Sequence, residues 1–110
     1  MFTDENAACM VISDDNYAML LTEKFFRNFI PGREICNPKS TEVLVALALE
    51  SRAKVDEIIS KAVAAGGSEY RKKQDYGWMY GRAFQDIDGH IWEAFYADLS
   101  AAPEEMKNRK

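Results

Sequence analysis

Hydrophobic and polar positions divide the first third of the chain into a hairpin and a short helix. Two apolar segments, "AACMVIS" and "YAMLLT", flank Asp14-Asp15-Asn16, whose residue types favour turns. This pattern predicts a β-hairpin over residues 7–22. The next run, "EKFFRNF" at residues 23–29, predicts a short helix that stops at Pro31-Gly32.

The middle of the chain changes from an apolar run to a helical spacing. "EVLVALALE", residues 42–50, is a continuous apolar run of strand length, which predicts a strand buried on both faces. Apolar residues then recur at helical spacing from Val55 to Val63. Ser51 is placed to cap the start of this helix, and Gly66-Gly67 supplies a left-handed stop.

The last third predicts a short extended piece at residues 69–71 and a second hairpin. Residues 78–85 and 90–98 form its strands, joined through "DIDG", in which Gly89 is placed for a positive φ. The whole order is strand, strand, short helix, then strand, helix and three strands. Such runs predict an α+β domain in which one helix covers a curved antiparallel or mixed sheet.

The second hairpin contains the main candidate site. With a four-residue turn, the numbers of paired residues add up to about 175, so Arg82 lies opposite or diagonal to Glu93. Trp78, Tyr80 and Phe84 then share a face with Arg82, and Ile91 and Phe95 share one with Glu93. Glu93 is either half of a cross-strand ion pair worth about 1 kcal/mol, or a ligand-binding carboxylate. The second role is open because an unpaired carboxylate in an apolar cleft costs several kcal/mol.

Composition and charge narrow the function classes. The chain has 110 residues, of which 47% are hydrophobic, and this fits one folded domain. A net charge of −4 with scattered basic residues favours neither nucleic acid nor an anionic membrane as a partner. Cys9 and Cys36 match no metal or disulfide spacing, and the N-terminus is acidic, so a cytoplasmic protein is expected. A single histidine, His90, cannot form a His-rich metal site.

The segment "YGRAFQDIDGHIWEAFY" resembles the C-terminal strand pair of the glyoxalase/bleomycin resistance/extradiol dioxygenase group, the vicinal oxygen chelate superfamily. "STEVLVALALES", the helix after it and "AAGGSEY" resemble the rest of a second βαβββ module, and the resemblance extends over residues 7–98. It implies one domain over residues 1–110. Residues 1–35 would be a partial first module without its first strand and helix, residues 40–98 a complete module and residues 99–110 a polar tail.

The resemblance also implies which residues would bind a metal. Members of this group often bind one divalent metal through His, Gln or Glu side chains on inward-facing strands, and Glu93 matches the ligand on the last strand. Leu44 stands at the position of a metal-binding His and Met19 at that of a Glu. A site with one remaining donor is too poor for tight binding, so we expect no metal and no cofactor.

The resemblance implies a small-molecule-binding protein, in which Trp78, Tyr80, Phe84 and Phe95 pack on the ligand and Arg82 and Glu93 bind its polar groups. One alternative is a metal-dependent lyase, transferase or dioxygenase with Glu93 as ligand or base. Another is a structural remnant without a ligand, and whether the protein is an enzyme stays open. The uncovered sheet edge of a partial module predicts a homodimer, for which strand or domain exchange is one available arrangement.

Overall fold

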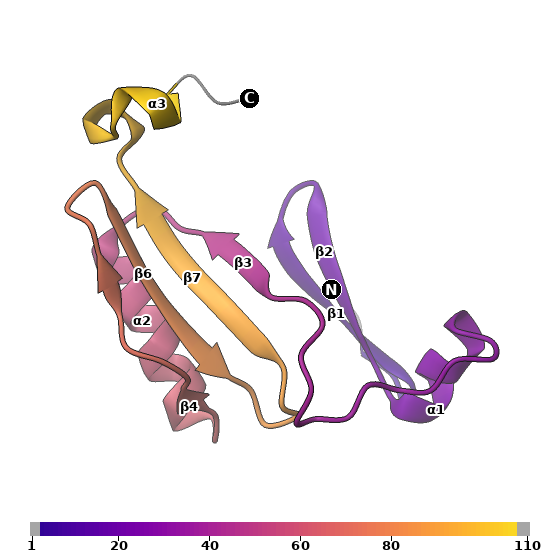
Figure 1. Ribbon diagram of the computed structural model, residues 1–110. Coiled ribbons are helices and arrows are strands. Elements are labelled where there is room, and N and C mark those ends of the chain that lie inside the picture. Colours follow the sequence, from indigo (N-terminus) through magenta and orange to yellow (C-terminus); the bar gives the residue numbers. More distant parts are fainter. Residues whose placement is uncertain (1–2, 108–110) are drawn as a thin grey trace. The chain divides into compact units, whose positions relative to one another are not determined.

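The structure, a computed structural model, describes residues 3–107, and the chain divides into two compact units, residues 1–36 and 37–110 (Figure 1). In the first unit, β1 (Ala7–Ser13) pairs antiparallel with β2 (Asn16–Leu21). They are followed by α1 (Glu23–Phe26) and a single 3-10 turn, η1 (Arg27–Phe29). The predicted hairpin and short helix are therefore confirmed.

The second unit contains a five-stranded mixed sheet. Its elements are β3 (Val45–Ala48), α2 (Arg52–Ala64), β4 (Ser68–Glu69), β5 (Gln74–Asp75), β6 (Met79–Gln85), β7 (Ile91–Ala97), η2 (Leu99–Ala101) and α3 (Glu104–Lys107). The strand order is β3-β7-β6-β4, and β5 also pairs with β6. β3 runs parallel to β7 and the other pairs are antiparallel. The predicted α+β class with a curved mixed sheet is confirmed, whereas β5, η2 and α3 were not predicted.

α2 covers one face of this sheet and forms its main core (Figure 1). The Ser51 side chain caps the helix by accepting a hydrogen bond from the Lys54 backbone N–H at 3.1 Å, as its sequence position predicts. Val55 and Ile59 lie one turn apart and are completely buried or nearly so, at 0% and 2% exposure. Val55 packs with Tyr80 of β6 and Ala94 of β7. The apolar stripe of the helix therefore meets the central strand pair.

β3 differs from its predicted environment. Among the described residues of this unit, β3 is an edge strand, which pairs with β7 along one side. Val45 is 42% exposed, and Ala46 and Ala48 are exposed as well. The prediction that residues 42–50 are buried on both faces was therefore wrong, because an apolar run of strand length occurs in edge strands as well as in central ones.

The register of the β6–β7 hairpin also differs from prediction, by one residue. Arg82 pairs with Ala94, and Glu93 pairs with Ala83. The turn contains an additional residue, because the Asp86 backbone N–H bonds to the His90 carbonyl at 2.9 Å and β7 begins only at Ile91. Since neighbouring residues of a strand point to opposite faces, this shift places Arg82 and Glu93 on different faces of the sheet.

None of the helices in the described residues 3–107 is long and apolar enough to cross a membrane. The cytoplasmic location, the homodimer and the partial first module stay predictions.

Candidate functional site

Pairing in the second unit sorts the side chains of β3, β6 and β7 onto two faces. The face that packs on α2, called the helix face, carries Val45, Leu47, Tyr80, Arg82, Phe84, Trp92, Ala94 and Tyr96. The opposite face, called the Glu93 face, carries Ala46, Ala48, Met79, Gly81, Ala83, Gln85, Ile91, Glu93, Phe95 and Ala97. The two faces have different chemistry and are considered separately.

Small residues surround the two long side chains at the centre of the Glu93 face. Glu93 lies on β7 between Ala46 of β3 and Ala83 of β6. Phe95, two residues further along β7, lies between Ala48 and Gly81 in the same way. An alanine or glycine fills little of the space beside the longer side chain of its neighbour, since these side chains end at Cβ or before it. The side chains of Glu93 and Phe95 therefore project beyond the small side chains of the neighbouring strands β3 and β6.

The partner of Glu93 is Arg71, whose Nη2 donates to the Glu93 carboxylate. The two side chains are 31% and 29% exposed, so water reaches both of them. Arg71 comes from the segment between β4 and β5, outside regular secondary structure. A carboxylate at the centre of an apolar strand needs such a counter-charge, because an unpaired charge would be costly there.

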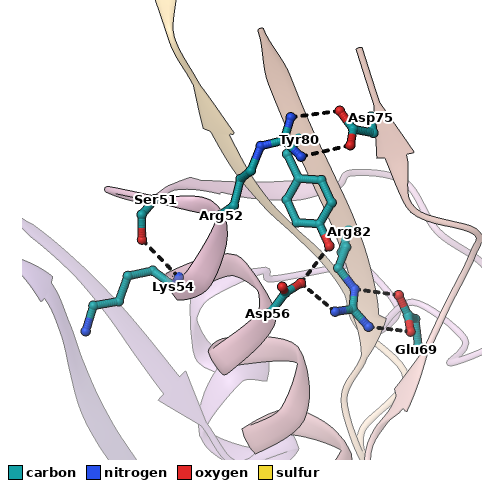
Figure 2. A network of polar contacts seen from close by, with 8 residues as sticks. All are labelled: Ser51, Arg52, Lys54, Asp56, Glu69, Asp75, Tyr80 and Arg82. Atoms are coloured by element: carbon teal, nitrogen blue, oxygen red, sulfur yellow. Dashed lines mark hydrogen bonds and ion pairs between the residues drawn. The ribbon is translucent and has the colours of Figure 1, made fainter. Parts of the chain in front are cut away.

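On the helix face, Arg82 joins α2 to β4 (Figure 2). Its Nε and Nη2 each donate to Glu69 at 2.8 Å, and its Nη1 donates to Asp56 Oδ1 at 2.7 Å. Tyr80 donates its hydroxyl proton to the same Asp56 oxygen at 2.6 Å. Hydrogen bonds from Tyr80 and then Arg82 lower the pKa of Asp56, and those from Arg82 lower the pKa of Glu69. This network of hydrogen bonds and ion pairs therefore links β6, α2 and β4, and it keeps Asp56 and Glu69 in their charged forms.

A second ion pair lies beside it. Arg52, in the first turn of α2, donates through both Nη atoms to Asp75 of β5 at 2.8 Å, and its guanidinium lies 4.9 Å from the centre of the Tyr80 ring (Figure 2). The hydrogen bonds from Arg52 hold the pKa of Asp75 far below its usual range. Both side chains are more than two-fifths exposed, so this pair is a surface contact that anchors β5.

The structure divides the six predicted site residues between the two faces of the sheet and the residue before β6. Glu93 and Phe95 share the Glu93 face, whereas Tyr80, Arg82 and Phe84 lie on the helix face. Phe84 stacks there on Trp92, with ring centroids 6.3 Å apart. Trp78 is half-buried and directly precedes β6. A ligand-binding role for each of the six stays a prediction, but the pairing of Arg82 with Glu93 was wrong.

Arg71 is the residue that sequence reasoning missed. Its segment, "EYRKK", has no periodicity that would place a side chain on either face. Three consecutive basic residues next to a two-residue strand were the available signal. That signal predicts a charged surface, but it does not predict that Arg71 contacts Glu93 on β7.

The residues around Glu93 do not fit a metal ion. The flanking Ala46 and Ala83 have no donor atoms in their side chains, and Glu93 is already bonded to Arg71. Across residues 3–107, His, Cys, Asp and Glu side chains form no group of three or more that could hold a metal. Protein metal sites generally need three or more such donors, so no chemical step is assigned to a metal here.

Comparisons with known proteins agree with this arrangement of strands and helix. No family model matches the chain, and no curated protein matches it. Among solved structures, a glyoxalase-related enzyme from Fulvimarina pelagi superposes with a TM-score of 0.70 at 17% identity, over 89% of this chain and 69% of that one. A glyoxalase/bleomycin resistance protein/dioxygenase from Nocardioides gives 0.63 at 22%, over 94% and 69%. The chain has the glyoxalase/bleomycin resistance/dioxygenase fold.

The hypothetical protein SA1046 from S. aureus has a similar structure, with a TM-score of 0.72 at 22% identity over 88% of this chain and 73% of that one. At these identities the likeness establishes the fold, and in this fold unrelated chemistries share one framework. Function must therefore be argued from the residues of the Glu93 face.

Proposed function

We propose that the protein binds a small organic molecule on the Glu93 face of its second unit. The observation that carries the proposal is a half-buried carboxylate placed beside an aromatic ring and flanked on both sides by alanine or glycine. A carboxylate that served only the fold would be expected at an edge or on the surface. Here Glu93 occupies the middle of β7, between β3 and β6.

The chemistry of this face fits a ligand with an apolar body and one polar group. Phe95 is partly exposed and offers apolar contact beside Glu93, and the small residues leave room for a ring or chain to lie along the sheet. The polar group of the ligand would bond to Glu93 or Arg71, whose mutual ion pair is exposed enough to open. Since water reaches both side chains, exchanging their contact for ligand contacts carries a modest cost.

The experiment is a compound screen by ¹H–¹⁵N NMR on the full chain, with aromatic and aliphatic molecules that carry an amine, an amide or a hydroxyl group. A binder should shift amide signals of β3, β6 and β7. Phe95→Ala should weaken binding by about tenfold, the loss expected for one ring contact. Phe84→Ala is the matched control, because it removes the same ring from the helix face, on the opposite side of the sheet from the ligand.

Two outcomes would contradict the proposal. One is a panel of a few hundred compounds in which none shifts these signals. The other is a binder whose affinity falls as much with Phe84→Ala as with Phe95→Ala, since its ligand would then lie elsewhere or depend on general stability.

A further inference from the structure

A hollow of about 610 Å³ lies over the segment that joins β4 to β5. Its lining residues are Glu69, Tyr70, Arg71, Lys72, Lys73 and Arg82. Four of these six carry a positive charge, in a chain whose net charge is −4. The hollow therefore gathers charge of the sign opposite to that of the whole protein, and it will attract anions locally.

Arg82 does not contribute to this attraction as a free group. All three of its guanidinium nitrogens already donate, two to Glu69 and one to Asp56. Two of its five N–H donors remain, but a guanidinium bonded to two carboxylates is electrically compensated and attracts an anion only weakly. Arg82 forms the wall of the hollow.

Lys72 and Lys73 are in a different situation. Within residues 3–107, neither ammonium group takes part in a hydrogen bond or an ion pair, whereas Lys54 and Lys61 both pair with Glu57. Lys73 is nevertheless close enough to act on the carboxylates nearby. The pKa values of Glu69 and Asp75 are lowered mainly by hydrogen bonds from Arg82 and Arg52, and the charge of Lys73 lowers both further. Two positive charges thus lie at the hollow without a counter-charge bonded to them.

Arg71 adds directional donors beside these two charges. Its Nη2 donates to Glu93, and a guanidinium has five N–H donors in total. A planar fork next to ammonium groups suits a tetrahedral oxyanion, which offers several acceptor oxygens at once. A phosphate group carries about −1.5 to −2 charges at neutral pH, which matches the two lysines that have no carboxylate bonded to them. A carboxylate would balance one of them.

We propose that this hollow is a binding site for a phosphate group, held by Lys72, Lys73 and the donors of Arg71 that Glu93 leaves free. The inference goes beyond the proposed function, because phosphate alone serves as the probe and no ligand on the Glu93 face is needed.

The geometry also gives Glu93 a defined effect on this site. Its carboxylate competes with phosphate for the same guanidinium, so Glu93→Gln should raise the affinity for phosphate by about threefold to tenfold. Lys72→Gln combined with Lys73→Gln should lower it at least tenfold. The two changes act in opposite directions, which general loss of structure cannot produce.

The test is a titration of the full chain with inorganic phosphate at constant ionic strength, followed by the amide signals of residues 69–73 in ¹H–¹⁵N spectra. Lys24→Gln combined with Lys39→Gln is the control, since both lysines are exposed, neither lines the hollow, and the change in net charge is equal. This control should leave the affinity within about twofold.

The proposal is overturned if both lysine pairs weaken phosphate equally, because the effect would then be one of net charge. It is also overturned if Glu93→Gln weakens phosphate, or if acetate at the same ionic strength binds as tightly. Spectra of the variants that overlay on the wild type outside residues 69–73 and the surroundings of each substituted residue would establish that each of them is folded.

Discussion

Replacing Arg82 with methionine tests whether this arginine serves the fold. The change keeps an unbranched apolar chain of similar length and removes three hydrogen bonds, two to Glu69 and one to Asp56. These bonds connect β6 to α2 and to β4, and β4 has only two residues with which to hold itself in the sheet. The variant should therefore unfold more easily and lose β4 first.

The size of the effect follows from exposure. Ion pairs in full contact with water contribute about 0–1 kcal/mol, and breaking a buried pair costs about 3–5 kcal/mol. Arg82 is 20% exposed, but its partners Glu69 and Asp56 are 35% and 51% exposed and regain water when it is removed. We expect a loss of about 2 kcal/mol in the free energy of unfolding, between the two limits.

The assay is urea denaturation followed by tryptophan fluorescence, since Trp78 and Trp92 both belong to the second unit and report on it. Arg52→Met is the matched comparison, because Arg52 also bonds to one carboxylate through two nitrogens but is 42% exposed. It should cost clearly less than Arg82→Met, because both charges of this pair already contact water. If Arg82→Met cost no more than Arg52→Met, the inference that exposure sets the contribution of these pairs would be refuted.

Three further predictions concern the whole chain. Because the pKa values of Asp56 and Glu69 are lowered in the folded state, their stabilisation is present above the unfolded values and lost as the pH falls through the folded ones. The unfolding free energy, measured from pH 7 to pH 2.5, should start to decrease when the pH drops under about 4.5. The decrease should be less steep in the double variant Asp56→Asn, Glu69→Gln. An unchanged slope in that variant would contradict this assignment. Gly67→Ala should lower the free energy of unfolding by about 2 kcal/mol in the same denaturation assay, because its Cβ would lie 2.6 Å from the Gln85 carbonyl oxygen. A loss under about 0.5 kcal/mol would mean that the backbone moves to relieve this contact. Light scattering after size-exclusion chromatography should give twice the chain mass of 12.5 kDa, and a single-chain mass would disprove the homodimer.

Local signals in the sequence predicted α2 and the turns well. Ser51 caps the helix as its residue type and position indicate, and Gly66 at its end has a φ of +107°. Gly89 has a φ of +94°, as the turn requires. The helix cap and the positive-φ glycines each depend on only a few neighbouring residues, so a single sequence is enough to predict them.

The composition of the site could not be predicted in the same way, because it depends on counting residues across a turn. One additional residue between β6 and β7 moved Glu93 from the face of Arg82 to the opposite face. The Asp86 side chain supports this longer turn by accepting hydrogen bonds from the backbone N–H groups of Asp88 and His90, both at 2.9 Å. A pattern of alternating residues is equally compatible with either register, and the contact of Arg71 with Glu93 joins segments that no local rule connects.

The parallel pairing of β3 with β7 has a consequence for how the chain folds. Val45 is the register partner of Trp92, so α2 and the whole of β6 lie between the two paired strands along the chain. Closing so long a loop is slow compared with forming a helix or a hairpin. In pulsed hydrogen exchange, the Leu49 amide, which donates to the Phe95 carbonyl, should gain protection after the amides of α2 and the β6–β7 hairpin. The strand that completes one side of the Glu93 face would then be the last to join, so this face would be complete only when folding of the unit ends.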